Sequence, residues 1–178
     1  MPQADGSDPV TAFRQIFAQA MLASLIAGAS VPAFAEDQPD YRDDRSTPEA
    51  VVDSLYNAVN RKEFLRAYSY FHAGADVPPI KTFAEGYADT RSVRVRTGKA
   101  TSDGAAGSIF YSLPVVVESV STAGKSTVFA GCYELRLVQP AVQALPPFQP
   151  LGIVKGKLAE TKVSFDEAKG KCAADGLE

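Results

Sequence analysis

The sequence predicts an α+β domain in which helices come first and antiparallel strands follow, after a cleavable signal peptide. Three observations support this fold class. Apolar residues recur at helical spacing between residues 47 and 87. After Thr90 the spacing changes to alternate positions, and β-branched residues become more frequent, as in strands. An uncharged apolar run, Ala20 to Val31, lies near the N-terminus.

Residues 1–35 have the features of a secretory signal peptide. The apolar run follows Arg14 and precedes a small-residue tripeptide that ends at Ala35, a pattern typical of signal-peptidase sites. We therefore expect cleavage before Glu36 and a periplasmic or secreted product without a stable membrane anchor. The alternative is an uncleaved anchor, because about twenty uncharged residues can cross a bilayer. Glycine, proline and other small residues within the stretch weaken a membrane helix and favour cleavage.

The mature chain is predicted to begin with a flexible lead-in over residues 36–46, which is charged and has no periodicity. A single domain is expected over residues 47–178. Thr47 can cap free backbone N–H groups and Pro48 suits the first helical position, so the first helix is predicted to begin here and to end near Asn60. Two shorter helices are predicted from the repeated spacing, over Phe64–Phe71 and Ile80–Tyr87.

Strands are predicted in the second half of the domain. Two long alternating segments are separated by a hairpin signal and are expected to pair antiparallel. A segment rich in proline after them cannot be a central strand. The predicted order is a strand at Ser92–Thr97, a turn-rich connection at Gly98–Gly107, the long strands Ser108–Val120 and Ser126–Val138, a surface loop or lid at Gln139–Pro150, and a last strand at Leu151–Val163.

Cys132 and Cys172 are the two cysteines of the chain. In an oxidising compartment an isolated pair is most simply a disulfide, which would tether the C-terminal tail. Closing a loop of this length stabilises a protein by about 4 kcal/mol in the entropic description. The alternatives are a reactive thiol or a metal pair, and neither the spacing of the cysteines nor the histidine content favours them.

The segment Thr47 to Phe71, TPEAVVDSLYNAVNRKEFLRAYSYF, resembles the first two helices of the nuclear transport factor two-like superfamily, which includes SnoaL-like cyclases and ketosteroid isomerase. Members have an Asn-x-x-Asp/Glu-like turn after the first helix and an Ala-Tyr pair in the second, here Ala67-Tyr68. The chain is also similar to small exported bacterial members without an assigned activity. The resemblance implies a cone-like curved antiparallel sheet covered by three helices, and a homodimer as one expected form. This fold hosts enzymes, carriers and interaction modules, so it does not decide function.

For an enzyme, the resemblance implies an acidic general base inside the cone, with a tyrosine or protonated acid holding the developing oxyanion. The inward faces of the two long strands offer tyrosines but no carboxylate, which counts against catalysis. The candidate catalytic residues are Asp89 or Glu134 as base, together with Tyr87. Each acid also has a structural interpretation: Asp89 suits a turn, and Glu134 suits a surface charge pair with Arg136.

The preferred hypothesis is a noncatalytic exported domain that binds a small apolar or amphipathic ligand, or an envelope protein partner. Tyrosines suit such a pocket because they combine an apolar ring with a polar hydroxyl. The alternative is a lyase or isomerase of the SnoaL-like or ketosteroid isomerase type, and a third interpretation is a structural envelope component whose cone is filled. The expected ligand-binding residues are Tyr56, Tyr68, Tyr87, Tyr111 (or its neighbour Phe110), Phe129 and Tyr133.

Charge and motifs argue against other classes. The formal net charge is −3, so a polyanionic partner such as nucleic acid is not expected. The basic stretch Arg91, Arg94, Arg96 and Lys99 is interpreted as the charge of an edge strand, with a patch for an anionic envelope component as the alternative. His72 is the only histidine, and no phosphate-binding loop or nucleophile motif is present. The sequence therefore predicts no metal and no cofactor.

Overall fold

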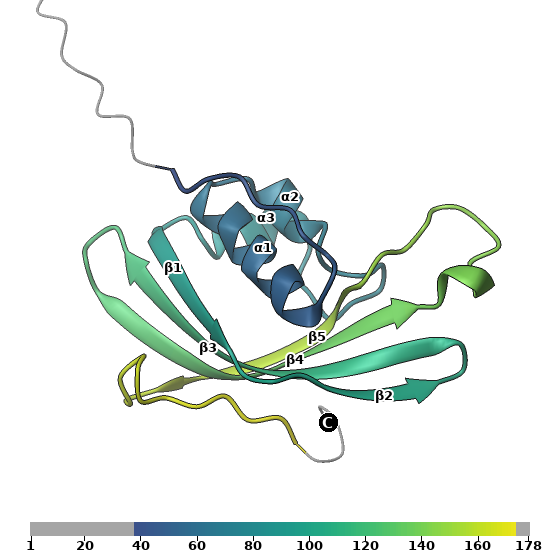
Figure 1. Ribbon diagram of the computed structural model, residues 1–178. Coiled ribbons are helices and arrows are strands. Elements are labelled where there is room, and N and C mark those ends of the chain that lie inside the picture. Colours follow the sequence, from purple (N-terminus) through teal and green to yellow (C-terminus); the bar gives the residue numbers. More distant parts are fainter. Residues whose placement is uncertain (1–37, 174–178) are drawn as a thin grey trace, which may run out of the picture. The chain divides into compact units, whose positions relative to one another are not determined.

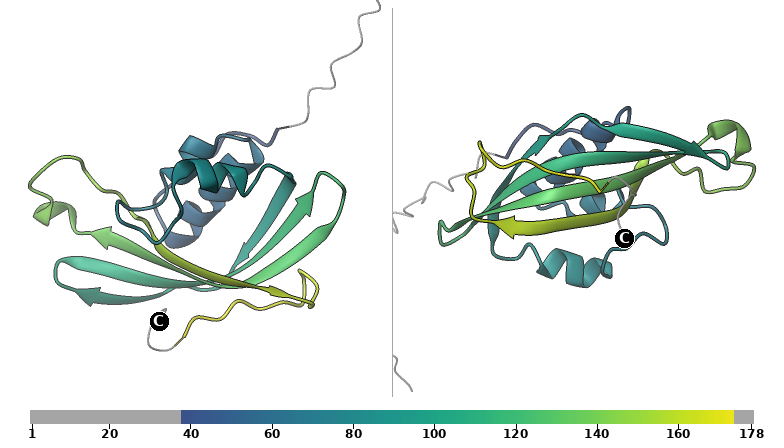
Figure 2. Two further views of the ribbon diagram at one scale, coloured as in Figure 1. Left: turned by 180° about the vertical axis from the view of Figure 1, so that it is seen from behind. Right: turned by 90° about the horizontal axis from the view of Figure 1, so that it is seen from below.

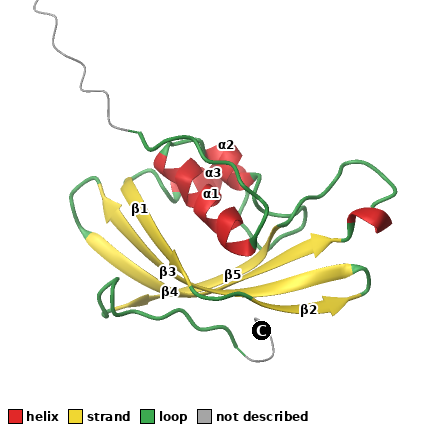
Figure 3. Ribbon diagram, in the orientation of Figure 1, coloured by secondary structure: helices red, strands yellow, loops and turns green. Residues whose placement is uncertain are grey.

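Helices precede strands along residues 38–173, the part of the chain that the computed structural model describes (Figures 1 and 3). The predicted signal peptide lies outside these residues. Within residues 38–173 no helix is long and apolar enough to cross a membrane. The elements are α1 (Pro48–Asn60), α2 (Phe64–Tyr68), α3 (Ile80–Glu85), β1 (Thr90–Thr97), β2 (Thr101–Ala105), β3 (Ser108–Ser121), β4 (Ser126–Val138), the short 3-10 helix η1 (Pro140–Val142) and β5 (Gly152–Thr161).

The sheet is organised around β3. One edge of β3 pairs antiparallel with β4 along nearly its whole length, and β5 pairs with the far edge of β4. The other edge of β3 is shared, because its first half pairs with β2 and its second half with β1. The sheet curves, and the three helices lie over its concave face (Figure 1). The predicted α+β class, with three helices on a curved antiparallel sheet, is therefore confirmed.

Helix α1 begins and ends as the sequence predicts. The Thr47 hydroxyl accepts a hydrogen bond of 3.1 Å from the Ala50 amide, and Pro48 occupies the first turn. At the other end, the Asn60 side-chain amide pairs with both the N–H and the C=O of Val93 in β1. The apolar face of α1 packs on the concave side of the sheet. The buried core includes Val51, Val52, Leu55 and Val59 from α1, with Leu113, Val115, Leu135 and Ile153 from the strands.

An aromatic cluster attaches the short helices α2 and α3 to the domain. Phe83 of α3 lies between the rings of Tyr68, Phe71 and Tyr87, with ring centroids 5.2 to 5.8 Å from its own. The Tyr87 ring also stacks on Phe64 of α2. Edge-to-face contacts of this kind stabilise beyond the apolar area they bury. The cluster therefore fixes the segment that contains Tyr87.

The C-terminal tail crosses the convex face of the sheet, opposite the helices (Figure 2). Its Phe165 ring lies under the Arg94 guanidinium, 4.4 Å from it, and the Arg96 guanidinium donates to the carbonyls of Phe165 and Ala168 at 2.7 Å. Beyond these contacts, Cys172 forms a disulfide with Cys132 of β4. The predicted disulfide is present, and it tethers the tail as expected.

Three segments differ from their predictions. The connection predicted at 98–107 contains the strand β2, which pairs with β3 and is exposed over residues 101–104. Residues 38–46, expected to be a flexible lead-in, lie against α1 and α2: Asn57 of α1 donates to the Asp40 carbonyl at 2.7 Å, and Arg66 of α2 donates to the Arg42 carbonyl at 2.6 Å. Helix α2 ends at Tyr68, three residues before its predicted end at Phe71. Phe71 instead forms an isolated parallel bridge to Ile153 of β5.

Candidate functional site

A cavity of about 330 Å³ lies between the helical layer and the concave face of the sheet. Helix α1, the segment after α3 and four strands all contribute to its wall. This volume is at the small end of the range for ligand pockets. The described residues that line it are Tyr56, Gly86, Tyr87, Thr90, Val93, Val117, Ser119, Phe129, Tyr133 and Leu158.

Two tyrosines meet at the buried side of this cavity. The hydroxyls of Tyr56 from α1 and Tyr133 from β4 are 2.7 Å apart and share a hydrogen bond. The two residues are only 4% and 7% exposed. Burial raises the pKa of Tyr56 well above its usual value, and burial also raises the pKa of Tyr133, although the Tyr56 hydroxyl partly offsets the rise at Tyr133. Both phenols are therefore neutral over the ordinary pH range.

Tyr87 adds a third hydroxyl to the cavity wall. Its ring is held by Phe83 and Phe64, while its hydroxyl makes no hydrogen bond to any described residue. Burial, followed by the nearby Tyr133 phenol, raises the pKa of Tyr87 far above its usual value. Tyr87 is therefore a neutral hydrogen-bonding group available to the cavity.

The wall between these hydroxyls is apolar and uncharged. Val93, Val117, Phe129 and Leu158 supply hydrocarbon surface, and Thr90 and Ser119 supply two small hydroxyl-bearing side chains. None of the described residues that line the cavity is Asp, Glu, Lys, Arg or His. Within residues 38–173 no group of three or more metal-ligating side chains is gathered in one place.

Four of the six expected ligand-binding residues meet in this cavity: Tyr56, Tyr87, Phe129 and Tyr133. Tyr68 instead packs in the aromatic cluster with Phe71 and Phe83. Tyr111 lies in the half of β3 that pairs with β2, and Phe110 beside it carries the Arg136 guanidinium over its ring. Thr90, Ser119 and Leu158 line the cavity without having been singled out in the sequence. The alternation of β3 could have indicated Ser119, because it shares the inward face of Val117.

The candidate bases lie away from this cavity. Asp89 is exposed, and its backbone carbonyl accepts a hydrogen bond from Thr122 at 2.8 Å. Glu134 alternates with Tyr133 along β4 and so faces the convex side of the sheet. The expected charge pair between Glu134 and Arg136 is not formed, since Arg136 donates to the Ser108 hydroxyl at 3.0 Å.

The proline-containing loop, residues 139–150, lies at the opposite end of β4 from the cavity. Phe129, near the start of β4, lines the cavity, whereas the loop begins after Val138, about 30 Å further along the strand. The Gln143 side chain fixes the loop by bonding the Val138 and Gln149 carbonyls, both at 3.0 Å. Of the two expected forms, surface loop or lid, the segment has the form of an ordered surface loop, and it exposes Leu145 and Phe148.

The basic stretch on β1 is used within the chain. Arg94 pairs with Glu118 of β3 at 2.6 Å, and both Arg94 and Arg96 contact the C-terminal tail. Their side chains point the same way, as alternate positions of a regular strand predict. Arg94 lowers the pKa of Glu118 through this hydrogen bond. These arginines therefore hold the tail and β3 rather than forming a separate charged patch.

Together the elements define an α+β domain in which three helices cover the concave face of a curved antiparallel sheet, with a tyrosine-lined cavity between them, the architecture that the sequence resemblance implies. No family model matches the chain, and no curated protein is significantly similar to it. Several solved structures resemble its backbone. A scytalone dehydratase candidate from Novosphingobium aromaticivorans is 8% identical over 73% of this chain and 92% of that one, with a TM-score of 0.49. From the same organism, the beta subunit of a candidate aromatic-ring-hydroxylating dioxygenase is 11% identical over 67% and 90%, with a TM-score of 0.45. A type 2 hexachlorocyclohexane dehydrochlorinase is 7% identical over 73% and 92%, with a TM-score of 0.40.

Proposed function

We propose that this protein is an exported, noncatalytic domain that binds a small apolar or amphipathic ligand in the cavity lined by Tyr56, Tyr87 and Tyr133. The observation that carries the proposal is the character of the wall. The wall combines hydrocarbon side chains with neutral hydroxyl groups, and none of the described lining residues carries a charge. Ligand pockets are typically apolar with a few polar groups that orient the ligand.

The disulfide and the predicted signal peptide support the export part of the proposal. A structural disulfide persists in the periplasm or outside the cell, whereas cytoplasmic reductants keep most thiols reduced. Cys132 is 1% exposed and bonded to Cys172, so the pair has a structural position rather than a catalytic one. These features are compatible with an exported protein, and cleavage before Glu36 remains a prediction.

The alternative, a lyase or isomerase, gains no specific support from the site. General-base catalysis needs a carboxylate within hydrogen-bond reach of the proton it removes. Asp89 is exposed and Glu134 faces the convex side of the sheet, so both lie outside the cavity wall. The buried tyrosines are protonated over the ordinary pH range and would donate rather than remove a proton.

Native mass spectrometry of the protein purified from its own host's envelope tests the proposal. The expected result is a chain that begins at Glu36, is two hydrogens lighter than its reduced form, and carries a small molecule that denaturation releases unchanged. Leu158→Trp, which places a large ring at the cavity wall, should lose that molecule. The control Leu65→Trp should retain it, because Leu65 is 75% exposed on α2.

Two results would contradict this function. One is a wild-type protein that carries no small molecule after purification from the envelope and binds none from an organic extract of that envelope. The other is a bound molecule that the protein converts into a product of different mass or structure during incubation. The second result would restore the enzyme alternative.

A further inference from the structure

A second groove, of about 370 Å³, lies at the end of β4 opposite the tyrosine-lined cavity. The last residues of β4 and the loop 139–150 form its wall, and no described residue lines both the groove and the cavity. Val138, Val142, Leu145 and Pro147 give the wall hydrocarbon surface. The volume is at the small end of the range for ligand pockets, so the groove suits a small molecule.

Hydrogen bonds hold the shape of this groove. The Gln143 side chain donates to the carbonyls of Val138 and Gln149 at 3.0 Å and accepts from the Gln149 N–H at 2.7 Å. His72 lies across the base of the loop, with Nε2 2.8 Å from the Arg136 carbonyl oxygen and Nδ1 2.9 Å from the side-chain oxygen of Gln149. Polar contacts therefore fix both ends of the loop, and its apolar side chains are left for the groove.

Arg136 places a positive charge in the wall. Its Nε donates to the Ser108 hydroxyl at 3.0 Å, and its guanidinium carbon lies 5.5 Å from the centroid of the Phe110 ring. These contacts position the guanidinium, while neither Nη1 nor Nη2 makes a hydrogen bond to any described residue. Arg136 is half-buried, and a partly buried charge without a partner is costly. A bound anion would therefore stabilise it.

The surroundings of Arg136 distinguish it from the other half-buried arginines of residues 38–173. Those three, Arg45, Arg61 and Arg66, each lie within 3.7 Å of a carboxylate oxygen. Arg136 has no such partner among the described residues, and it is the one charged residue among those that line the groove. From Leu137 to Val154 the sequence contains no ionisable side chain. An incoming anion therefore meets a cation and no competing carboxylate in the wall.

We propose that this groove is a second binding site, which takes a small organic acid with an apolar ring or chain. The carboxylate accepts hydrogen bonds from Nη1 and Nη2 of Arg136, because the planar guanidinium matches two carboxylate oxygens. The apolar part lies on the hydrocarbon wall. The end of a peptide chain fits less well, since the β4 residues of the wall already pair with β3 and leave no free strand edge for a peptide backbone.

Titrations followed by ¹H–¹⁵N NMR test the site, because they report both the affinity and the location of a ligand. The probes are 3-phenylpropanoate, its uncharged analogue 3-phenylpropanamide, and the peptide acetyl-Gly-Gly-Phe with a free C-terminal carboxylate. At neutral pH and low salt we expect 3-phenylpropanoate to bind about tenfold more tightly than the amide, as a charge-assisted pair of hydrogen bonds allows. The backbone signals of Val142, Leu145 and Gln149 should shift, and those of Phe129 and Leu158 in the cavity should not.

Arg136→Gln removes the charge, so the acid and the amide should bind this variant equally. Arg91→Gln is the matched control, because Arg91 is an exposed arginine of β1 outside the groove, and it should keep the preference for the acid. Leu145→Ser should weaken both probes by the same factor, since it removes apolar wall and leaves the charge. Leu145 is 82% exposed, so this variant still folds and tests the site even if Arg136→Gln does not fold. Leu158→Trp, which fills the cavity, should leave binding of the acid unchanged.

Three results would overturn the proposal. The first is a wild-type protein that binds the acid and the amide equally, or binds neither. The second is a peptide that binds more tightly than 3-phenylpropanoate, which would assign the groove to chain ends instead of small acids. The third is an acid that shifts the cavity signals or loses its affinity in Leu158→Trp, which would place it in the cavity. Because the two sites share no described residue, failure here leaves the proposed function of the cavity intact.

Discussion

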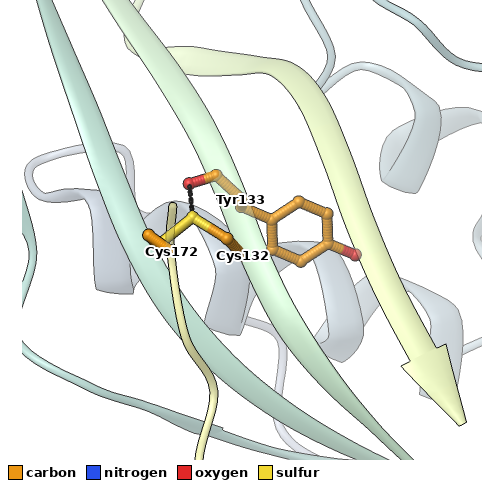
Figure 4. The surroundings of a disulfide bond; sticks show 3 residues. All are labelled: Cys132, Tyr133 and Cys172. Carbon is orange, nitrogen blue, oxygen red and sulfur yellow. Dashed lines mark hydrogen bonds between the residues drawn. A yellow bond between two sulfur atoms is a disulfide. The ribbon is translucent and has the colours of Figure 1, made fainter. Parts of the chain in front are cut away.

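Cys132 and Tyr133 are consecutive residues of β4 whose side chains point to opposite faces of the sheet (Figure 4). On the convex face, Cys132 bonds Cys172 and fixes the tail. On the concave face, the Tyr133 hydroxyl meets Tyr56 inside the cavity. Because side chains alternate along a strand, one short segment supports both the tether and the candidate site. The two can therefore be perturbed separately.

Removal of the disulfide should destabilise the fold without emptying the cavity. For Cys132→Ser/Cys172→Ser we expect the free energy of unfolding to fall by about 4 kcal/mol, because the bond closes a loop with a sequence separation of 40. Guanidinium unfolding under oxidising conditions measures this loss. The small molecule retained from the host's envelope should stay bound to the folded variant, as measured by native mass spectrometry. An unchanged unfolding free energy would contradict the tether.

Arg96→Gln should loosen the tail. Arg96 donates to the carbonyls of Phe165 and Ala168, so the variant removes charge-assisted bonds on which the tail depends. Trypsin should then cleave after Lys162 or Lys169 several times faster than in wild type, as followed by mass spectrometry. The matched control is Arg91→Gln, since Arg91 is an exposed arginine of the same strand. Equal cleavage rates in all three proteins would show that Arg96 does not hold the tail.

The hydroxyls of Tyr56 and Tyr133 should be energetically coupled. Each single Phe variant removes one partner of a buried hydrogen bond, and we expect each to lower the free energy of unfolding by about 1 kcal/mol. The double variant should cost no more than one single variant, because the shared bond can be lost only once. Urea unfolding of the four proteins completes this cycle. Additive losses would indicate that the two hydroxyls act independently.

Alkaline pH should weaken the fold through the same pair. The pKa values of Tyr56 and Tyr133 are raised in the folded protein above the ordinary value of 10.0. Their contribution to stability is therefore fully present below about pH 10 and is lost as the pH rises above it towards the folded pKa values. Urea unfolding between about pH 9 and about pH 11.5 should show a steeper loss in wild type than in Tyr56→Phe/Tyr133→Phe. Parallel curves would contradict the raised pKa values.

The local signals in the sequence were strongest for α1 and the long strands. Thr47, Pro48 and the apolar spacing marked the helix, and the alternation around the hairpin marked β3 and β4 closely. β2 gave no such signal, because Thr101–Gly104 is exposed on both faces and contains Gly and Asp, which are poor strand formers. Its strand structure comes from pairing with the first half of β3, which is a tertiary effect.

The candidate site was predicted in part for a similar reason. Strand alternation placed Phe129 and Tyr133 on the inward face, and helical spacing placed Tyr56 there. Where each inward residue lies along the sheet depends on how the helices cover it, which the local pattern does not encode. Tyr111 therefore lies away from the cavity, and Tyr68 packs in the aromatic cluster around Phe83 instead.

The central claim is that a small ligand occupies the cavity at three tyrosines. NMR of protein labelled with ¹³C at the tyrosine Cζ atoms, titrated with an organic extract of the host's envelope, tests it most directly, because each of the seven tyrosines gives its own signal. We expect the signals of Tyr56, Tyr87 and Tyr133 to shift together, while the signal of Tyr41, which is 60% exposed, stays unchanged. Unchanged signals, or shifts confined to tyrosines outside the cavity, would contradict it.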